Sequence, residues 1–443
     1  MNAMVKLYLQ GVFWFLVYLI VTLAPLFVLL LGPVSAGRGF WREFSVALGF
    51  AGLAMMGWQF ALTARFRRVK APFGSDIVYF FHRQISLVTF VLIVAHPVIL
   101  FVTAPDTLQL LNVFSAPWRA RAGVTAVLAL VALIAISLWR KRFKIHYDRW
   151  RMWHGVLATA AVALAMAHIV GVGYYVGTPW KRALWIGYGA VWVGLLAYVR
   201  IVKPWLELKR PYRVEQVTQE RGNAWTLALR PDGHKGITFG PGQFAWLTIW
   251  DSPFLDKEHP FSFSSSAARP ERLEFTIKEL GDFTARIKDV KPGQAVYLDG
   301  PHGAFSIDRH PDAPGYVFIT GGVGITPVMS MLRTLADRGD RRPLLLIYAN
   351  KTWETVTFRE EIETLRERLN LRVVHVLEKA PEGWKQEKGF VNADILKRHL
   401  PQDKSHHEHF ICGPEPMMNA VEKTLNQLGV PFARFHSERF NLV

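Results

Sequence analysis

Cysteine is almost absent from this chain, and its scarcity removes several kinds of site. The 443 residues contain one cysteine, Cys412, so no disulfide can form within the chain. Because there is no CxxC pair, covalent attachment of a c-type haem and an iron–sulfur cluster held by cysteines are excluded. The sequence also lacks an EF-hand calcium loop and the GxGxxG dinucleotide fingerprint. A bound metal or redox cofactor would therefore need ligands other than cysteine.

Acidic residues are also scarce in relation to basic ones. The chain has 35 Asp and Glu against 52 Lys and Arg, which gives a formal net charge of +17. Such an excess can indicate nucleic-acid binding, but here the basic residues gather in short loops at 64–70, 139–151 and 199–210. Positive residues in short loops mark the cytoplasmic side of a membrane. We therefore exclude a nucleic-acid partner and expect both termini and the second half of the chain to be cytoplasmic.

Long apolar runs fill the first half of the chain, and 51% of all residues are hydrophobic. A run of about twenty apolar residues is long enough to cross a bilayer. Six spans are expected, at 7–32, 42–63, 77–103, 120–139, 149–173 and 181–201. The first run is too long for the apolar part of a signal peptide, so we interpret it as a retained span. The sequence predicts an integral membrane protein, and we place it in a bacterial inner membrane.

Four histidines lie inside two of these spans with a repeated spacing. His82 and His96 are fourteen residues apart, and so are His154 and His168. Fourteen residues make almost four helical turns and a rise of roughly 21 Å, so both members of a pair face the same side. A lone buried histidine is more often a hydrogen-bonding residue, but ionisable groups at this depth are costly and rare. The matched pairs predict two b-type haems, the inner one at His82 and His154 and the outer one at His96 and His168.

The geometry at Pro97 and the possibility of zinc binding bear on these four histidines, and three other histidines form a separate cluster. Pro97 follows His96 and disfavours helical geometry there, so the outer pair could be displaced. Zinc at the four histidines is unfavourable because the members of a pair are too far apart to share one ion. The remaining cluster, His406, His407 and His409, lies in a polar stretch, and we predict a solvated loop for it.

The second half of the chain reads as two soluble domains. Short strand-like runs at 224–230, 243–250, 273–280 and 294–300 are separated by turns, which indicates a small antiparallel barrel. From about Gly315 apolar runs alternate with helical stretches, which indicates a parallel sheet with crossover helices. These runs lie at 316–322, 344–350, 371–377 and 409–413. We place the domains at 1–205, 206–312 and 313–443.

Five motifs in the second half occur in a recognisable order. They are HPFSFSS (259–265), FTIKELGDFT (275–284), DGPHGAF (299–305), TGGVGITPVMSML (320–332) and CGPEPMM (412–418). Together they resemble the flavin and pyridine-nucleotide motifs of the ferredoxin–NADP reductase superfamily. With the six spans and four histidines, residues 40–443 resemble the NADPH oxidase / ferric reductase superfamily, in a prokaryotic-type form. The resemblance implies a six-helix transmembrane bundle, an antiparallel β-barrel FAD domain and an α/β parallel-sheet NAD(P)H domain.

The resemblance also implies which residues contact the flavin. Phe261 offers an aromatic face to the isoalloxazine, and Ser262 offers a hydroxyl near N5 of the ring. His259 stands where the family often has arginine, so its charge at the flavin phosphate depends on pH near neutrality. Further flavin contacts are implied at Pro260, Lys278, Gly281 and Thr284. Without its neighbours, the HPFS motif could equally be a strand with a buried Phe.

The nucleotide motif has its own physical interpretation. In TGGVGITP, Gly321, Gly322 and Gly324 allow a close approach to a phosphate, and the following helix N-terminus supplies N–H donors. A plain glycine-rich turn is the alternative. The resemblance implies that the segment from Thr320 to Pro327, with Thr326, holds the NAD(P)H pyrophosphate.

Three other positions complete the nucleotide site that the resemblance implies. Cys412 lies beside the nicotinamide, with Gly413 and Pro414 shaping the pocket, although a lone cysteine could also be a small core residue. Phe440 corresponds to an aromatic that covers the flavin and moves to admit nicotinamide. Since a 2′-phosphate needs cationic partners, Lys351 and Arg359 favour NADPH over NADH.

The function that follows is electron transfer across a membrane. A flavin is needed between a two-electron donor and one-electron haems, so NADPH, FAD and two haems form one path, with Phe261, Ser262, Cys412 and Phe440 at the hydride-transfer step. We favour an oxidase that reduces extracytoplasmic oxygen to superoxide, with no obligatory protein partner evident. The alternatives are a ferric-chelate reductase, a haem subunit feeding an extracytoplasmic partner protein, and a non-catalytic haem sensor.

Overall fold

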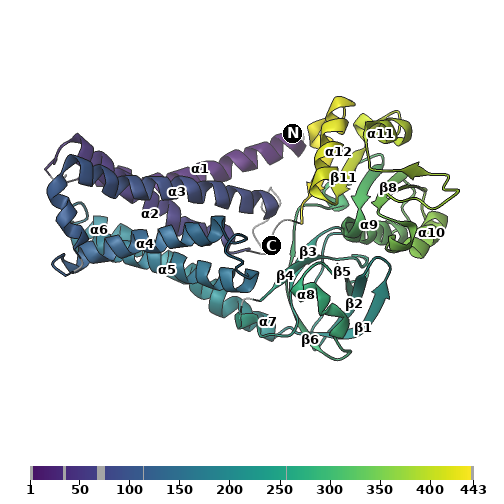
Figure 1. Ribbon diagram of the computed structural model, residues 1–443, viewed down its shortest axis with the longest axis horizontal. Coiled ribbons are helices and arrows are strands. Elements are labelled where there is room, and N and C mark those ends of the chain that lie inside the picture. The colour runs from purple at the N-terminus through teal and green to yellow at the C-terminus, as the bar shows by residue number, and fades with distance from the viewer. Residues whose placement is uncertain (1–2, 33–35, 67–74, 113, 256, 441–443) are drawn as a thin grey trace. The chain divides into compact units, whose positions relative to one another are not determined.

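The computed structural model describes residues 3–32, 36–66, 75–112, 114–255 and 257–440. The chain divides into two compact units, Met1–Phe66 with Ile77–Pro204, and Arg67–Asp76 with Trp205–Val443. In the described part of the chain the first unit is helical, and every strand belongs to the second unit (Figure 1).

The helical unit contains the six predicted spans. Its helices are α1 (Ala3–Leu29), α2 (Phe40–Thr63), α3 (Ser75–Thr103), α4 (Trp118–Leu138), α5 (Tyr147–Val172) and α6 (Pro179–Ala197). All six are long and apolar enough to cross a membrane, and the sixth continues through a π-helical turn (Tyr198–Val202) and α7 (Lys203–Leu208). Pro97 lies inside α3 without ending it, so the helix continues past His96 to Thr103. The six-span prediction is confirmed.

Close packing of apolar and aromatic side chains holds this unit together. Phe50, Leu53 and Ala54 of α2 are buried in one core with Trp185 and Trp192 of α6. A Cβ atom on Gly57 would lie 2.1 Å from the Trp192 ring, so glycine is required where α2 meets α6. The outward side chains are large and apolar, as the exposed Phe13, Ile20, Val91, Val102 and Leu128 illustrate. Such an exposed apolar surface suits contact with lipid.

The second unit begins with an antiparallel sheet. Its strands are β1 (Tyr212–Glu220), β2 (Ala224–Pro231), β3 (Phe244–Thr248), β4 (His259–Ser262), β5 (Leu273–Lys278) and β6 (Ala295–His302), in the order β4-β3-β6-β1-β2-β5. The inner side chains, including Val214, Leu227, Leu247 and Phe275, form one buried core. The antiparallel FAD-type domain is confirmed. β1 and β4 are strands in addition to the four runs predicted.

A parallel sheet completes this unit. Its strands are β7 (Tyr316–Gly321), β8 (Leu344–Asn350), β9 (Leu371–Leu377), β10 (Glu387–Lys388), β11 (Glu408–Cys412) and β12 (Phe435–Glu438), in the order β10-β9-β8-β7-β11-β12. Helices α9 (Ile325–Asp337) and α10 (Arg359–Arg368) cover one face, and α11 (Ala393–His399) and α12 (Glu415–Gln427) cover the other (Figure 1). Burial on both faces explains the continuous apolar runs in the central strands. The parallel sheet is confirmed, with β10 and β12 as strands that the sequence did not indicate.

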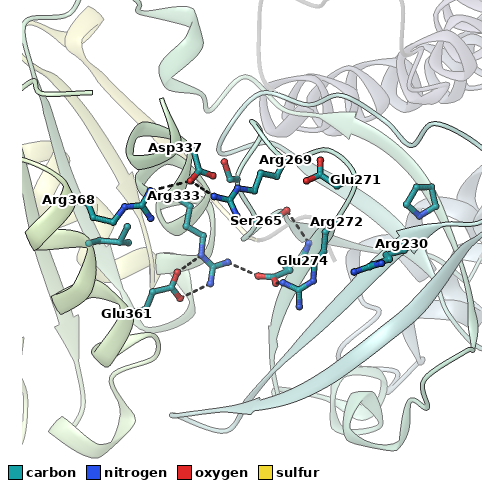
Figure 2. Close-up of a pocket in the computed structure, with 13 residues that line it drawn as sticks. Arg230, Ser265, Arg269, Glu271, Arg272, Glu274, Arg333, Asp337, Glu361 and Arg368 are labelled. Atoms are coloured by element: carbon teal, nitrogen blue, oxygen red, sulfur yellow. Dashed lines mark hydrogen bonds and ion pairs between the residues drawn. The ribbon is translucent and has the colours of Figure 1, made fainter. Parts of the chain in front are cut away.

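Helix α9 joins the parallel sheet to the antiparallel one. Arg333 donates to Glu274 Oε2 of β5 at 2.8 Å (Figure 2) and to the Ser264 carbonyl at 2.7 Å. On its other side it donates to both carboxylate oxygens of Glu361, at 2.6 and 2.7 Å. At the next residue, Thr334 Oγ1 accepts the Ala267 backbone N–H at 2.8 Å. Arg333, Glu274 and Glu361 line a cavity of about 600 Å³, and the hydrogen bonds of Arg333 and Thr334 connect the two sheets.

Candidate functional site

The inner histidine pair has the separation that a shared iron requires. The ring centres of His82 in α3 and His154 in α5 lie 6.3 Å apart, with 60° between the ring planes. A metal lies about 2 Å from a histidine nitrogen, and adding about 1 Å from each nitrogen to its ring centre gives about 6 Å between centres. The side chains thus fit one iron atom with two axial imidazoles.

Each inner histidine also has a hydrogen-bond partner on the ring nitrogen that would face away from the iron. His82 Nδ1 lies 2.7 Å from Gln59 Oε1, and His154 Nδ1 lies 3.2 Å from Ser137 Oγ. The Ser137 hydroxyl donates to the Leu133 carbonyl, so it can accept from His154. Protonated Nδ1 atoms leave the Nε2 lone pairs for a metal, which is the usual arrangement of ligating histidines.

The outer pair follows the same rule with different partners. His96 Nδ1 lies 2.9 Å from the Ser45 carbonyl, and His168 Nδ1 lies 2.8 Å from the Arg119 carbonyl. A carbonyl oxygen can only accept a hydrogen bond, so Nδ1 carries the proton and Nε2 is again free. All four sequence-predicted ligands therefore have the tautomer that haem iron needs.

Glycines bring neighbouring helices against the outer histidines. A Cβ atom on Gly49 of α2 would lie 3.2 Å from the His96 ring, and one on Gly123 of α4 would lie 2.8 Å from His168 Nδ1. A Cβ contact as short as the one at Gly123 is essentially never seen, so a larger residue there would displace the His168 ring, whereas the contact at Gly49 is tight and would require a small shift of His96. The sequence contains both glycines, but only the packing of the helices reveals what they contact.

The flavin motif forms an aromatic platform on the antiparallel sheet. The His259 ring stacks on Phe283 with ring centres 3.8 Å apart, and Phe261 lies 6.0 Å from Phe283 at an interplanar angle of 19°. Trp250 contacts the edge of the same phenyl ring. Phe283 lies in α8 (Asp282–Ala285) and was not singled out in the sequence. Its central place in this cluster makes it a further candidate for flavin contact.

Two buried hydroxyls in the predicted cofactor motifs have no hydrogen-bond partner among the described residues. They are Ser262 Oγ at the end of β4 and Thr320 Oγ1 near the end of β7. Ser262 is 5% exposed and Thr320 is fully buried. Buried polar groups are nearly always satisfied. The hydroxyls therefore fit positions where a bound flavin and a bound nucleotide would supply the missing partners.

The loop after β5 shows what its three predicted residues do. The Thr284 hydroxyl accepts the backbone N–H groups of Leu280 and Gly281 at 2.8 and 2.9 Å, so it maintains the shape of the loop. Lys278 is half-buried at the end of β5, and no atom within 4 Å would meet a Cβ at Gly281. A phosphate contact here would fall to Lys278 and the loop backbone. Pro260 pairs with Trp246 of β3 in the sheet register.

The glycines of TGGVG have two different tasks. A Cβ on Gly324 would lie 2.3 Å from the Cys412 carbonyl, and one on Gly321 would lie 2.8 Å from Pro414 Cδ. These two glycines let the loop pack against the CGP loop. There, a Cβ atom on Gly413 would lie 2.9 Å from the Gly321 backbone nitrogen. Gly322 has φ +54° and open space around its Cβ position, so it is the glycine that leaves backbone accessible to a phosphate.

The remaining residues of this motif face inward. Thr326 and Pro327 are buried in α9, and the Thr326 hydroxyl donates to the Val323 carbonyl at 2.9 Å. Their side chains support the first turn of the helix, and the backbone N–H groups at its start are the groups that could meet a phosphate.

Cys412 ends β11 as a fully buried thiol. Burial, together with the nearby Glu438 charge, raises the pKa of Cys412 well above its ordinary value. Glu438 pairs with Cys412 in the register of β11 and β12, a neighbour that only the tertiary structure reveals. The thiol is therefore protonated at neutral pH.

The residues predicted to bind the 2′-phosphate and the aromatic residue predicted to cover the flavin differ in their exposure and in their existing contacts. Lys351 is exposed after β8. The Arg359 guanidinium lies 4.6 Å over the Trp353 ring and donates to Glu360 at 2.9 Å, so it is already engaged. Phe440 is 43% exposed, and the three residues after it lie outside the described residues.

The predicted solvated loop at 406–409 is wrong for two of its three histidines. His409 lies inside β11 and is fully buried, and His407 is 4% exposed, while His406 is exposed. The apolar run predicted at 409–413 already contained His409, so the two predictions for this residue conflicted, and the strand is the correct one. Burial lowers the pKa of three histidines in this unit to about 4. We call His310, His375 and His409 the buried histidine group.

One cluster of side chains has the spacing of a metal site but lacks the negative charge that a divalent ion would need. Ligand atoms of His310, Glu408 and His436 lie within 4.8 Å of one another. Arg434 already donates to Glu408 Oε1 at 2.6 Å, and His436 lies 2.8 Å from Oε2. Because the arginine neutralises the one carboxylate, a divalent ion would add uncompensated positive charge. The contacts define an ion-paired cluster that joins β11 and β12.

Comparison with known proteins agrees with this division of the chain. Residues 48–165 match the ferric reductase like transmembrane component, residues 226–306 an FAD-binding domain, and residues 318–423 an oxidoreductase NAD-binding domain. These matches define a flavin- and pyridine-nucleotide-binding reductase joined to a membrane component. The chain thus has the ferric reductase / NADPH oxidase architecture, as the motifs predicted.

The curated relatives match the reductase half. The glycine betaine monooxygenase reductase subunit of Pseudomonas aeruginosa is 30% identical over 245 residues, which is 53% of this chain and 65% of that protein. Human NADH-cytochrome b5 reductase 2 is 33% identical over 172 residues, or 34% of this chain and 62% of the relative. In both cases the match covers less than two thirds of the relative's length. Among solved structures, the FAD/NAD-binding domain of a Vibrio cholerae nitric oxide dioxygenase aligns with 52% of this chain and 98% of that chain, at 24% identity and a TM-score of 0.46.

Proposed function

We propose that this chain is a transmembrane NAD(P)H oxidase that carries electrons from cytoplasmic NADPH to extracytoplasmic oxygen and produces superoxide. The observation that carries this proposal is the inner histidine pair, whose ring centres are 6.3 Å apart. A pair of imidazoles at this separation, with proton-bearing Nδ1 atoms, suits a haem better than a packing or zinc role.

The residues of the reductase half would place the hydride donor. Bound FAD would accept a hydride and release electrons singly, and bound haems would carry them one at a time. Ser262 has a buried hydroxyl without a partner, which suits a hydrogen bond to the flavin. Cys412 supplies a neutral, buried surface at the end of β11, and Phe440 would have to leave the flavin before nicotinamide could stack on it.

The haem ligation restricts the final step. If histidine fills both axial positions of each iron, oxygen has no open coordination site and would be reduced at the haem edge. The second candidate function, reduction of an anionic ferric chelate, is favoured by one observation. Arg119, whose carbonyl meets His168, has an exposed side chain, and so does Arg121. Two cations beside the outer histidine would attract such an acceptor.

The proposed nucleotide preference depends on which of the two candidate cations, Lys351 or Arg359, is exposed and could reach a 2′-phosphate. Exposed Lys351 could meet a 2′-phosphate, whereas Arg359 is engaged with Glu360. We therefore propose NADPH, with NADH as the alternative because the human relative is named for NADH. Lys351→Glu should lower kcat/KM for NADPH and leave NADH unaffected, and equal losses for both nucleotides would contradict the assignment.

The orientation is proposed from the distribution of charge. Basic loops at 64–70, 139–151 and 199–210 support a cytoplasmic reductase half with both termini on that side, and a bacterial inner membrane is the proposed host.

The test is an NADPH titration of the purified, FAD-supplemented protein with and without air. We expect the Soret and α bands of bis-histidine haem to become reduced without oxygen. Air should reoxidise them rapidly, with a superoxide-dismutase-sensitive signal from a reporter. Slow reoxidation in air but rapid reoxidation by a ferric chelate would replace the oxidase with the chelate reductase. A wild-type protein without a bis-histidine spectrum, or a His82→Ala variant with unchanged haem content, would overturn the haem path.

A further inference from the structure

The two histidine pairs have partners of different kinds. Both outer histidines meet backbone carbonyls, those of Ser45 and Arg119, and His96 Nδ1 also lies 3.0 Å from the Ser45 hydroxyl. Both inner histidines meet side chains, and the shorter contact is the 2.7 Å one between Gln59 Oε1 and His82 Nδ1. A backbone carbonyl is present whatever the residue is, whereas a side-chain acceptor depends on the residue chosen at that position.

We propose that Gln59 is a positioning residue that fixes the orientation and tautomer of His82 and thereby sets the reduction potential of the inner haem independently of the outer one. This rests on the function proposed above, since it requires haem at His82 and His154. Gln59 acts through His82 and does not itself coordinate the iron.

The strength of this contact follows from its length and its surroundings. Gln59 is 8% exposed within a membrane span, where a hydrogen bond is stronger than in water. An acceptor on Nδ1–H raises the electron donation of the imidazole. A more basic ligand favours ferric over ferrous iron and lowers the potential. The matching bond at His154 is 3.2 Å long and ends on the Ser137 hydroxyl, so it contributes less.

The amide group of Gln59 has a second property that points to the same role. Its Nε2 is buried and has no hydrogen-bond partner among the described residues. Rotating the amide by half a turn would direct Nε2 at His82 Nδ1. The histidine proton would then have to lie on Nε2, the atom that the iron needs. The orientation with an unsatisfied Nε2 is therefore the one that keeps His82 able to bind a metal, despite the cost of a buried donor.

The experiment is an anaerobic potentiometric titration of the full-length, haem-loaded protein, followed in the α band. Gln59→Met removes the acceptor with little change of volume and should raise the inner-haem potential. Gln59→Glu places a stronger acceptor there and should lower it. Loss of such a partner typically changes metal affinity 10–100-fold. If the affinity changes for only one oxidation state of the iron, the potential shifts by about 60–120 mV, at 59 mV per tenfold for one electron.

Ser45→Ala serves as the matched control at the outer haem. The carbonyl that His96 contacts remains, and only the Ser45 hydroxyl, 3.0 Å from His96 Nδ1, is lost. We expect its two potentials to stay close to those of the wild type. Movement of one transition in opposite directions in the two Gln59 variants supports the proposal.

Unchanged potentials, equal movement of both transitions, or a shift of the same sign in both Gln59 variants overturn it. If Gln59→Met fails to load haem, Gln59→Glu alone decides the sign. Failure of the proposed function is distinguishable, because the wild-type protein would then show no bis-histidine spectrum and no pair of transitions, and the role of Gln59 would fall with it.

Discussion

Arg333 offers the sharpest test of how the reductase half is held together. Its guanidinium makes two hydrogen bonds toward the antiparallel sheet, to Glu274 and the Ser264 carbonyl, and two toward Glu361 on α10. Figure 2 shows the contacts with Glu274 and Glu361. Replacing Arg333 with Ala would remove all four and leave the Glu274 carboxylate, 12% exposed, with Arg272 as its neighbouring cation. We therefore expect a loss of stability without any change to the cofactor motifs themselves.

The size of the effect depends on burial. Breaking a buried ion pair by removing one partner costs about 3–5 kcal/mol. Arg333 is 17% exposed, but Glu361 is 38% exposed, so its share resembles a surface pair worth at most about 1 kcal/mol. With Arg272 still beside Glu274, a total of about 3 kcal/mol is reasonable. For a unit of this size each kcal/mol lowers Tm by about 2–4 °C, so a decrease of about 6–12 °C is expected.

The assay is thermal release of FAD from the purified full-length protein, read as the rise in flavin fluorescence. Arg338→Ala is the matched control, because it removes an arginine that lies five residues further along the chain. Arg338 forms an ion pair with Asp308, and their side chains are 44% and 38% exposed, respectively. The control should lower the release temperature by no more than about 3 °C. If Arg333→Ala melts within the range of the control, the buried contacts do not stabilise the joint between the sheets.

Three further outcomes are expected. Gly123→Ala should lower the haem-to-protein ratio by displacing His168, while Gly194→Ala, with open space at its Cβ, should not; equal pyridine-haemochrome values for both would contradict the close packing. Cys412 should resist maleimide at pH 8 until the protein is denatured, because burial raises its pKa and suppresses the thiolate, and rapid labelling of the native protein would contradict this. The buried histidine group has pKa values lowered to about 4, so below about pH 6.5 the unfolded chain binds more protons and stability falls toward pH 4, by about 1.4 kcal/mol per pH unit for each histidine. Thermal melts between pH 7 and 5 should show this slope, and His375→Gln should reduce it.

The features that the sequence predicted well are those fixed by local spacing. The fourteen-residue interval places His82 and His96 on one helix face by covalent geometry alone, and the described α3 keeps that face despite Pro97. Strands β8 and β9 coincide with the runs predicted at 344–350 and 371–377, because a strand buried on both faces is a continuous apolar run.

The features that the sequence missed depend on neighbours from other segments. Phe283 stood inside a quoted motif, but its contact with His259 follows from the fold of the loop. β12 is short, its residues are half-buried, and it carries no continuous apolar run. His409 was assigned to a loop because the residues before it are polar, although the run predicted at 409–413 also contained it; pairing with Val317 of β7 places it in strand β11 of the parallel sheet.

The most informative mismatch is between the symmetry of the sequence and the asymmetry of the structure at the two haem positions. Equal spacing makes the pairs look equivalent, and nothing in that spacing distinguishes His82 from His168. In the folded chain His168 meets a carbonyl that every residue would supply, whereas His82 meets the amide of Gln59. Ligand positions can be read from one helix, because they are properties of its period. Under the proposed function, reduction potentials cannot be read in this way, because they would depend on which side chain a second helix presents. A single substitution in α2 would then change the potential of one haem without changing the ligands of either.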